Sequence, residues 1–64
     1  MDTQLRSFHT VAVHGGFTAA AKALNIGQPT ISSQVKALEE RYRVELFHRR
    51  GRSVELTETG RRLL

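Results

Sequence analysis

The chain has 64 residues, a net charge of +4 and no cysteine. A chain this short buries only about 60% of its unfolded surface, which suffices for one small domain and excludes a second core. The lack of cysteine excludes disulfides and thiolate metal sites. No apolar run approaches the roughly 20 residues of a membrane span, and the N-terminus lacks a signal-peptide pattern, so we expect a cytoplasmic protein without a membrane segment.

The first predicted element is a helix over residues 3–14. Its apolar residues recur at helical spacing and form one buried face: Leu5, Phe8, Val11 and Ala12. Asp2 or Thr3 can cap its start, and residues 15–16 are glycines, which favour a helix end. This helix is predicted to be scaffold.

A second, very short helix is predicted over residues 19–24, which are rich in alanine. Thr18 precedes it as the expected N-cap, and residues 25–27 then break the helical pattern. The small alanines allow another helix to approach closely.

The third predicted helix covers about residues 28–42. Pro29 suits a first helical turn, with Gln28 or Gly27 as the cap. Four residues at helical spacing are expected to be buried: Ile31, Val35, Leu38 and Tyr42. Two glutamates and a later arginine are spaced to form ion pairs: Glu39, Glu40 and Arg43.

Partial alternation after this helix predicts two short strands, at residues 45–49 and 53–56, with residues 50–52 as the turn. A two-stranded hairpin alone is marginally stable, so its apolar residues must pack onto the helices. Thr57 then caps a last helix, in which Glu58 can reach two arginines: Arg61 and Arg62. We expect this short helix to continue in a longer protein, so the predicted division of the chain is one domain over residues 1–57 and the start of a further helix over residues 58–64.

Positive charge is concentrated after residue 40. Residues 1–40 carry equal numbers of acidic and basic residues, whereas residues 41–64 carry seven arginines and three glutamates. The arginine fork suits phosphates and guanine edges better than the point charge of lysine does. A polyanionic partner is therefore one interpretation, and a basic surface that only aids solubility is the other.

The short second helix, the turn and the third helix have the layout of a helix-turn-helix motif. The outward side of the third helix begins with slim hydrogen-bonding residues: Gln28, Pro29, Thr30, Ser32 and Ser33. Glutamine can pair with adenine, and serine or threonine can meet phosphates or base edges in the major groove. A merely solvated face is the alternative, although adjacent serines are poor choices for an ordinary exposed helix.

The arginines of the predicted turn, Arg50 and Arg52, follow this motif as a wing would. Such side chains can reach the minor groove or the sugar-phosphate backbone. An exposed turn can also carry arginines that have no partner.

The remaining polar residues offer no catalytic or metal-binding pattern. The histidines, His9, His14 and His48, are dispersed, and no serine or threonine has a nearby base with an orienting acid. So small a chain can hardly enclose a substrate pocket. We therefore expect no catalytic residues, no metal and no cofactor, and predict that the protein is not an enzyme.

The spaced motifs, taken together, resemble the N-terminal domain of LysR-type transcriptional regulators. They cover nearly the whole chain: Leu5-x-x-Phe8, Gly16-Phe17-Thr18-x-Ala20-Ala21-x-x-Leu24, Gln28-Pro29-Thr30-Ile31-Ser32, Val35-x-x-Leu38-Glu39, Leu46-Phe47-x-Arg49-x-x-Arg52 and Leu56-Thr57-x-x-Gly60. The resemblance implies a mainly helical, winged helix-turn-helix domain with a three-helix core, a two-stranded wing and the start of a fourth, linker helix. It also implies a homodimer or tetramer through the linker helix, a separate domain that binds a small-molecule effector, and a nucleoid-associated location.

The resemblance and the outward faces together predict the DNA-contacting residues: Thr18, Gln28, Pro29, Thr30, Ser32, Ser33, Lys36, Arg49, Arg50 and Arg52. Three positions depart from the family pattern. Gly16 and Gly27 stand where the family often has serine, and Ser33 stands where many members have a larger residue.

The predicted function is sequence-specific binding of double-stranded DNA by a bacterial transcriptional regulator, with the third helix in the major groove and the wing at the minor groove or backbone. Two alternatives are a basic helical module that binds proteins and an architectural protein that binds DNA of any sequence. Salt dependence and competition with unrelated duplex distinguish the three.

Overall fold

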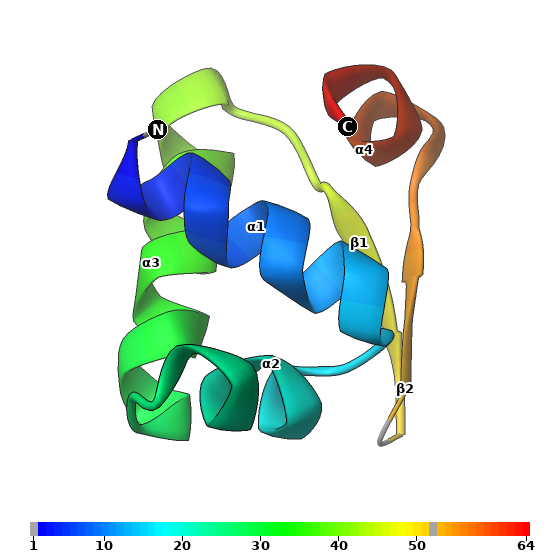
Figure 1. Ribbon diagram of the computed structural model, residues 1–64. Coiled ribbons are helices and arrows are strands. Elements are labelled where there is room, and N and C mark those ends of the chain that lie inside the picture. Colours follow the sequence, from blue (N-terminus) through cyan, green and yellow to red (C-terminus); the bar gives the residue numbers. More distant parts are fainter. Residues whose placement is uncertain (1, 52) are drawn as a thin grey trace.

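The computed structural model of the protein describes residues 2–51 and 53–64, so the predicted contact residue Arg52 lies outside the described residues. Its elements follow in this order: α1 (Thr3–His14), α2 (Phe17–Leu24), α3 (Gln28–Tyr42), β1 (Phe47–Arg50), β2 (Ser53–Leu56) and α4 (Glu58–Leu63). In Figure 1, α1 lies between α3 and the β1–β2 hairpin, and α4 lies at the end of the molecule opposite to α2. The predicted three-helix core with a hairpin and a fourth helix is confirmed.

The core lies where the three first helices meet the base of the hairpin. Among the described residues, it consists of nine buried side chains: Phe8, Val11, Ala20, Ala21, Ile31, Val35, Leu38, Leu46 and Phe47. The rings of Phe8 and Phe47 pack at 5.4 Å between centroids, which fastens the hairpin to α1. The two buried alanines of α2, Ala20 and Ala21, allow the close helix approach that their small size predicts.

The structure shows which of the alternative residues cap α1 and α3. Asp2, not Thr3, caps α1, since its Oδ1 accepts from the backbone N–H groups of Gln4 at 2.7 Å and Leu5 at 3.1 Å. Gly27, not Gln28, caps α3, and Pro29 occupies the first turn as predicted. Because glycine has no side chain to accept, this cap leaves the first amides of α3 without a side-chain partner.

The prediction that Thr18 caps α2 is wrong. The helix starts at Phe17 with Gly16 as the cap, and the N–H of Ala20 donates to the Gly16 carbonyl at 3.2 Å. The cause is tertiary, because the Phe17 ring packs edge-on against Phe47 at 6.0 Å and draws residue 17 into the helix. The Thr18 hydroxyl is thereby free to bond elsewhere.

Two predictions for the last turn of α3 are also wrong. Ile31, Val35 and Leu38 are fully buried as expected, but Tyr42 is 55% exposed, because it lies in the last turn and its hydroxyl accepts from Arg41 at the surface. The predicted ion pairs of Glu39 and Glu40 with Arg43 do not form among the described residues. Arg43 leaves the helix in the left-handed conformation (φ 55°), which removes it from helical spacing.

The hairpin is shifted relative to the prediction by its contacts with α3. The first strand begins at Phe47 and not at residue 45, since the N–H of Leu46 donates to the carboxylate of Glu39. The two strands pair antiparallel from Phe47 with Leu56 to Arg50 with Ser53, so Arg50 belongs to the strand and not to the turn. Gly51 supports the tight turn with a φ of 62°.

Helix α4 is joined to the segment before β1 by its cap. Thr57 caps it as predicted, because its Oγ1 accepts from the N–H of Gly60 at 2.9 Å. The same hydroxyl donates to the Glu45 carbonyl at 2.7 Å, and the Thr57 N–H donates to the Leu46 carbonyl at 3.0 Å. The predicted pair of Glu58 with Arg62 forms at 2.8 Å, whereas Arg61 donates to the Leu56 carbonyl at 3.1 Å and not to Glu58. The orientation of α4 is therefore set by the bonds of Thr57 to the backbone carbonyls of residues 45 and 46.

Candidate nucleic-acid interface

The outward face of α3 is polar and exposed from its first turn. The predicted contact residues on this helix all lie exposed: Gln28, Pro29, Thr30, Ser32, Ser33 and Lys36. Ile31, Val35 and Leu38 anchor the opposite face in the core, so the helix cannot rotate without exposing them. The buried hydroxyl of Ser7 adds a second anchor by donating to Gln34 Oε1. The fold therefore presents a slim face that fits the width of the major groove.

Thr18 and Gln28 connect the starts of α2 and α3. The Thr18 hydroxyl donates to Gln28 Oε1 at 3.2 Å, which leaves the amide N–H donors of Gln28 available to another acceptor. Both side chains border a groove of about 430 Å³ between the helices and the hairpin. Its lining residues are Phe17, Thr18, Gln28, Arg49, Gly51 and Val54. Three predicted contact residues from three different elements thus surround one hollow.

Arg49 is held in this hollow by contacts on two sides. Its Nη2 lies 3.2 Å from Glu39 Oε1, and its guanidinium lies over the ring of Phe17 at 5.2 Å from the centroid. The side chain remains 46% exposed, so part of its fork of N–H donors stays open to a phosphate. Arg49 therefore combines a structural position with an accessible positive charge.

Arg50 and Lys36 are not brought into the same hollow. Arg50 instead borders a second depression, which Glu45, His48 and Arg49 also line. It also lies 3.8 Å from Glu55, with both side chains exposed. Lys36 borders a third hollow further along α3. These two residues supply charge at the margins of the surface.

Two residues that hold this surface together, Phe17 and Glu39, are not among the predicted contact residues. Both stand in the family motifs, but the sequence assigns no contact to Phe17 and only Arg43 as a partner to Glu39. Their true partner, Arg49, lies on β1, and no helical or strand periodicity connects it with α2 or α3. Only a spacing pattern shared by many relatives could have indicated the contact.

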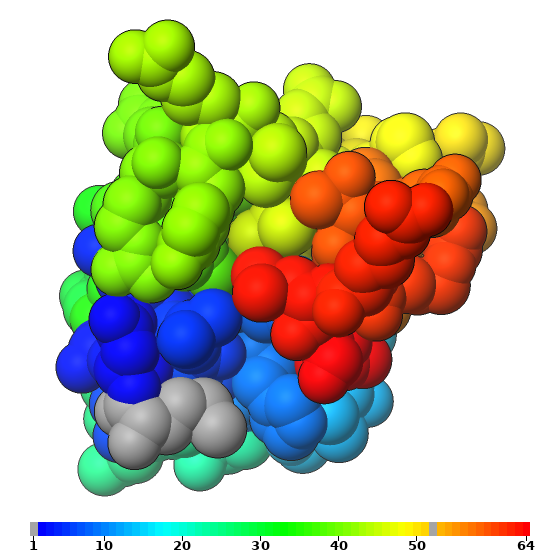
Figure 2. Space-filling model, turned by 90° about the horizontal axis from the view of Figure 1, so that it is seen from above, coloured from blue at the N-terminus to red at the C-terminus, as the bar shows by residue number. Residues whose placement is uncertain are grey.

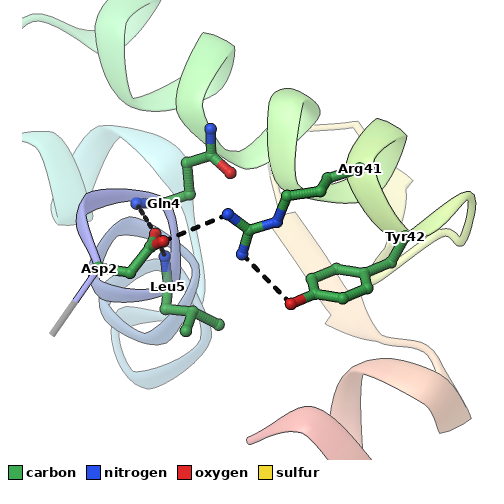
Figure 3. A network of polar contacts seen from close by, with 5 residues as sticks. All are labelled: Asp2, Gln4, Leu5, Arg41 and Tyr42. Atoms are coloured by element: carbon green, nitrogen blue, oxygen red, sulfur yellow. Dashed lines mark hydrogen bonds and ion pairs between the residues drawn. The ribbon is translucent and has the colours of Figure 1, made fainter.

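A separate charged network lies at the far end of α3 (Figure 3). Arg41 Nη1 pairs with Asp2 Oδ2 at 3.2 Å, and Arg41 Nη2 donates to the Tyr42 hydroxyl at 3.4 Å. The hydrogen bond from the Leu5 N–H, followed by that from Arg41, lowers the pKa of the Asp2 carboxyl. The hydrogen bond to Asp2 in turn raises the pKa of Arg41. This network joins α1 to α3 and lies away from the groove.

The described residues contain no group of three or more histidine, aspartate or glutamate side chains that could hold a metal ion. Among the helices of these residues, none has the length and apolar character needed to cross a membrane.

Comparison with known proteins identifies the family. Residues 3–61 match the model of the bacterial regulatory helix-turn-helix protein, lysR family. The chain is 48% identical to the RuBisCO operon transcriptional regulator of Allochromatium vinosum over 58 residues, which cover 91% of the chain and 19% of that protein. The chain thus spans less than half the length of the curated relatives that it matches.

Solved structures agree with this match. The structure of a complex between DNA and the CbnR DNA-binding domain aligns with a TM-score of 0.91 at 43% identity, covering 97% of this chain and 72% of that one. The complex of the BenM DNA-binding domain with catB site 1 DNA aligns with a TM-score of 0.92 at 38% identity, covering 98% and 71%. The winged helix-turn-helix predicted from the sequence is therefore confirmed, and the chain belongs to the lysR family of bacterial regulatory helix-turn-helix proteins.

Proposed function

We propose that this chain binds double-stranded DNA in a sequence-specific manner, as the DNA-binding part of a bacterial transcriptional regulator. The observation that carries the proposal is the meeting of Thr18, Gln28 and Arg49 around one groove, next to the exposed polar start of α3. In this proposal the first turns of α3 contact base edges in the major groove, while the hairpin contacts the minor groove or the backbone. The two similar DNA-binding domains whose structures contain DNA support it.

The proposed contacts divide by their chemistry. Gln28, Thr30, Ser32 and Ser33 offer hydrogen bonds to base edges, and Pro29 lets the helix backbone approach closely. The charged residues and the exposed start of α2 contact phosphates: Thr18, Lys36, Arg49, Arg50 and Arg52. The seven arginines of residues 41–64 favour such a polyanionic partner over a neutral protein surface.

We propose that the protein has no enzymatic activity. We also propose that it is located in the bacterial cytoplasm, on the nucleoid. In the corresponding division of the chain, residues 1–57 form the DNA-binding domain and residues 58–64 start a linker helix. Any small-molecule effector would bind a different domain of the whole protein, as the resemblance implies.

The test is enrichment of bound duplexes from a random library at fixed salt. A recovered motif, with binding that resists competition by unrelated duplex, is the expected result. Binding without a motif would instead favour an architectural role. Binding that depends weakly on salt would favour a protein partner.

The same proposal includes assembly through α4. Leu63 and Leu64 are 39% and 54% exposed, and they line a shallow hollow with Leu5, Phe8 and His9. Helix α4 lies against α1 on the face seen in Figure 2. We propose that this apolar edge pairs with a second copy, so that two α3 helices lie about one turn of duplex apart on an inverted repeat.

Sedimentation of this chain, alone and with duplexes of one or two half-sites, tests the assembly. So short a helix buries too little for a durable interface, which needs above about 1,000 Å². We expect a monomer or weak dimer alone and a second copy on the two-half-site duplex. A tight dimer without DNA at sub-micromolar concentration would place the association on another surface.

A further inference from the structure

One carboxylate, that of Glu39 in the fourth turn of α3, contacts both the residue before the hairpin and its first strand. Its Oε2 accepts from the backbone N–H of Leu46 at 2.8 Å, and its Oε1 pairs with Arg49 Nη2 at 3.2 Å. Its side chain is only 12% exposed and its bond to the Leu46 N–H is part-buried, whereas the Arg49 side chain is 46% exposed. Glu39 therefore determines where the first strand lies relative to α3.

The contact with Arg49 reaches a third element. The guanidinium lies over the Phe17 ring, at the start of α2, and borders the groove that Thr18 and Gln28 also line. The Arg49 side chain is thus confined between α2, α3 and β1. A guanidinium confined in this way loses less conformational entropy when it binds a phosphate than a free side chain would lose.

The charge of Glu39 by itself opposes binding to DNA. A carboxylate next to a surface that meets phosphates repels them, and its neutralisation would raise the net charge from +4 by one unit. Simple electrostatics therefore predicts tighter binding when Glu39 is neutralised. If Glu39 instead orients Arg49, its neutralisation should weaken binding to DNA. One substitution therefore distinguishes the two roles of Glu39.

We infer that Glu39 is a positioning residue for DNA binding, which acts by holding Arg49 and the hairpin in the orientation that a phosphate of the duplex requires. This inference rests on the proposed function. In this inference Glu39 does not contact DNA and acts only through Arg49 and Leu46.

The experiment compares Glu39→Gln with Glu40→Gln on the duplex enriched by the parent chain. Both substitutions remove one negative charge from adjacent residues of α3. Among the described residues, the exposed Glu40 carboxylate has no ion-pair partner, which makes it the matched control. A glutamine at position 39 can still accept from the Leu46 N–H, so we expect the fold to persist.

We expect Glu39→Gln to weaken binding about tenfold, the scale of one charge-assisted hydrogen bond, while Glu40→Gln binds as tightly as the parent or more tightly. Parent-like or tighter binding by both variants would overturn the inference. Failure of the parent chain to bind any duplex selectively would instead overturn the proposed function, so the two failures are distinguishable.

A second set of variants separates positioning from stability. In an Arg49→Gln background, Glu39→Gln should cause no further loss of affinity, because the group that it positions is gone. An undiminished loss in that background would overturn the inference in favour of a general effect on the fold. If Glu39→Gln fails to fold, Arg49→Lys replaces it, because lysine keeps the charge but lacks the planar fork. Parent-like binding by Arg49→Lys would show that a positioned fork is not needed and would overturn the inference.

Discussion

The hydroxyl of Thr18 donates to the side-chain oxygen of Gln28 across 3.2 Å and thereby joins the start of α2 to the first residue of α3. The bond orients the Gln28 amide at the edge of the groove. A fixed amide has less rotamer freedom to lose when it meets a base, so this contact should sharpen discrimination between base pairs.

Replacement of Gln28 or Ser33 by alanine should weaken binding to the preferred duplex by about 1 to 3 kcal/mol and weaken binding to random duplex much less. Both side chains are exposed, so the fold should remain intact. Titrations of labelled duplex at one salt concentration measure both losses. Equal losses on the two duplexes would mean that these residues contact only phosphates.

Replacement of Arg50 by alanine should flatten the slope of log K against log salt by about one unit, since one phosphate contact is lost. The same change is expected for Arg52→Ala from the sequence. Arg62→Ala is the matched control, because Arg62 lies on α4, which is remote from the start of α3 (Figure 1). A slope equal to that of the parent would show that the substituted arginine contacts no phosphate.

Replacement of Leu38 by alanine should destabilise the domain by about 2 to 5 kcal/mol, because it leaves a cavity in a fully buried position. Tyr42→Ala, one turn later on α3, should cost much less, because Tyr42 is largely exposed. Thermal or urea unfolding followed by circular dichroism compares the two. Similar losses for both variants would place Tyr42 in the core after all.

Replacement of Gly60 by alanine should destabilise the domain by about 1 to 3 kcal/mol through overpacking. A Cβ at this buried position would overlap the Leu46 carbonyl oxygen and approach Leu56 Cδ2 to 2.9 Å. Gly27→Ser is the contrasting change, because a Cβ there would make only ordinary van der Waals contacts and a serine can cap α3, for a gain of a few tenths of a kcal/mol. The unfolding midpoint should fall for Gly60→Ala and rise for Gly27→Ser. An unchanged midpoint for Gly60→Ala would show that α4 can move away from Leu46 without loss of stability.

Replacement of Asp2 by asparagine should lower the melting temperature at neutral pH but not in strong acid. The pKa of the folded carboxyl lies below its ordinary value of 3.8, so its stabilisation is present above that value and disappears as the pH falls through the folded pKa. Asparagine can still cap α1 but cannot pair with Arg41. Melts of parent and variant from pH 7 to pH 2 should therefore converge at the acid end. A difference that stays constant with pH would mean that the charge of Asp2 does not stabilise the fold.

The amino-acid sequence by itself determined the helical segments, the buried stripe of α3 as far as Leu38, and the cap at Thr57. It also determined the exposed polar face that begins at Gln28 and the family to which the chain belongs. The helices, the stripe, the cap and the polar face depend on spacing and side-chain chemistry within one or two turns of chain, which local periodicity records, whereas the family follows from motifs along nearly the whole chain. For the same reason the outward residues of α3 could be predicted before their neighbours were known.

Only the tertiary structure decided which residues meet across elements. It assigned Glu39 to Arg49 and Leu46, moved the start of α2 to Phe17, left Tyr42 exposed, and placed Arg49 but not Arg50 in the groove beside Thr18 and Gln28. Each of these contacts depends on how the hairpin docks against the helices. Docking minimises the exposed apolar surface of Phe8, Phe17 and Phe47 together, so the partners of the polar residues around them follow from that packing and not from their spacing in the chain.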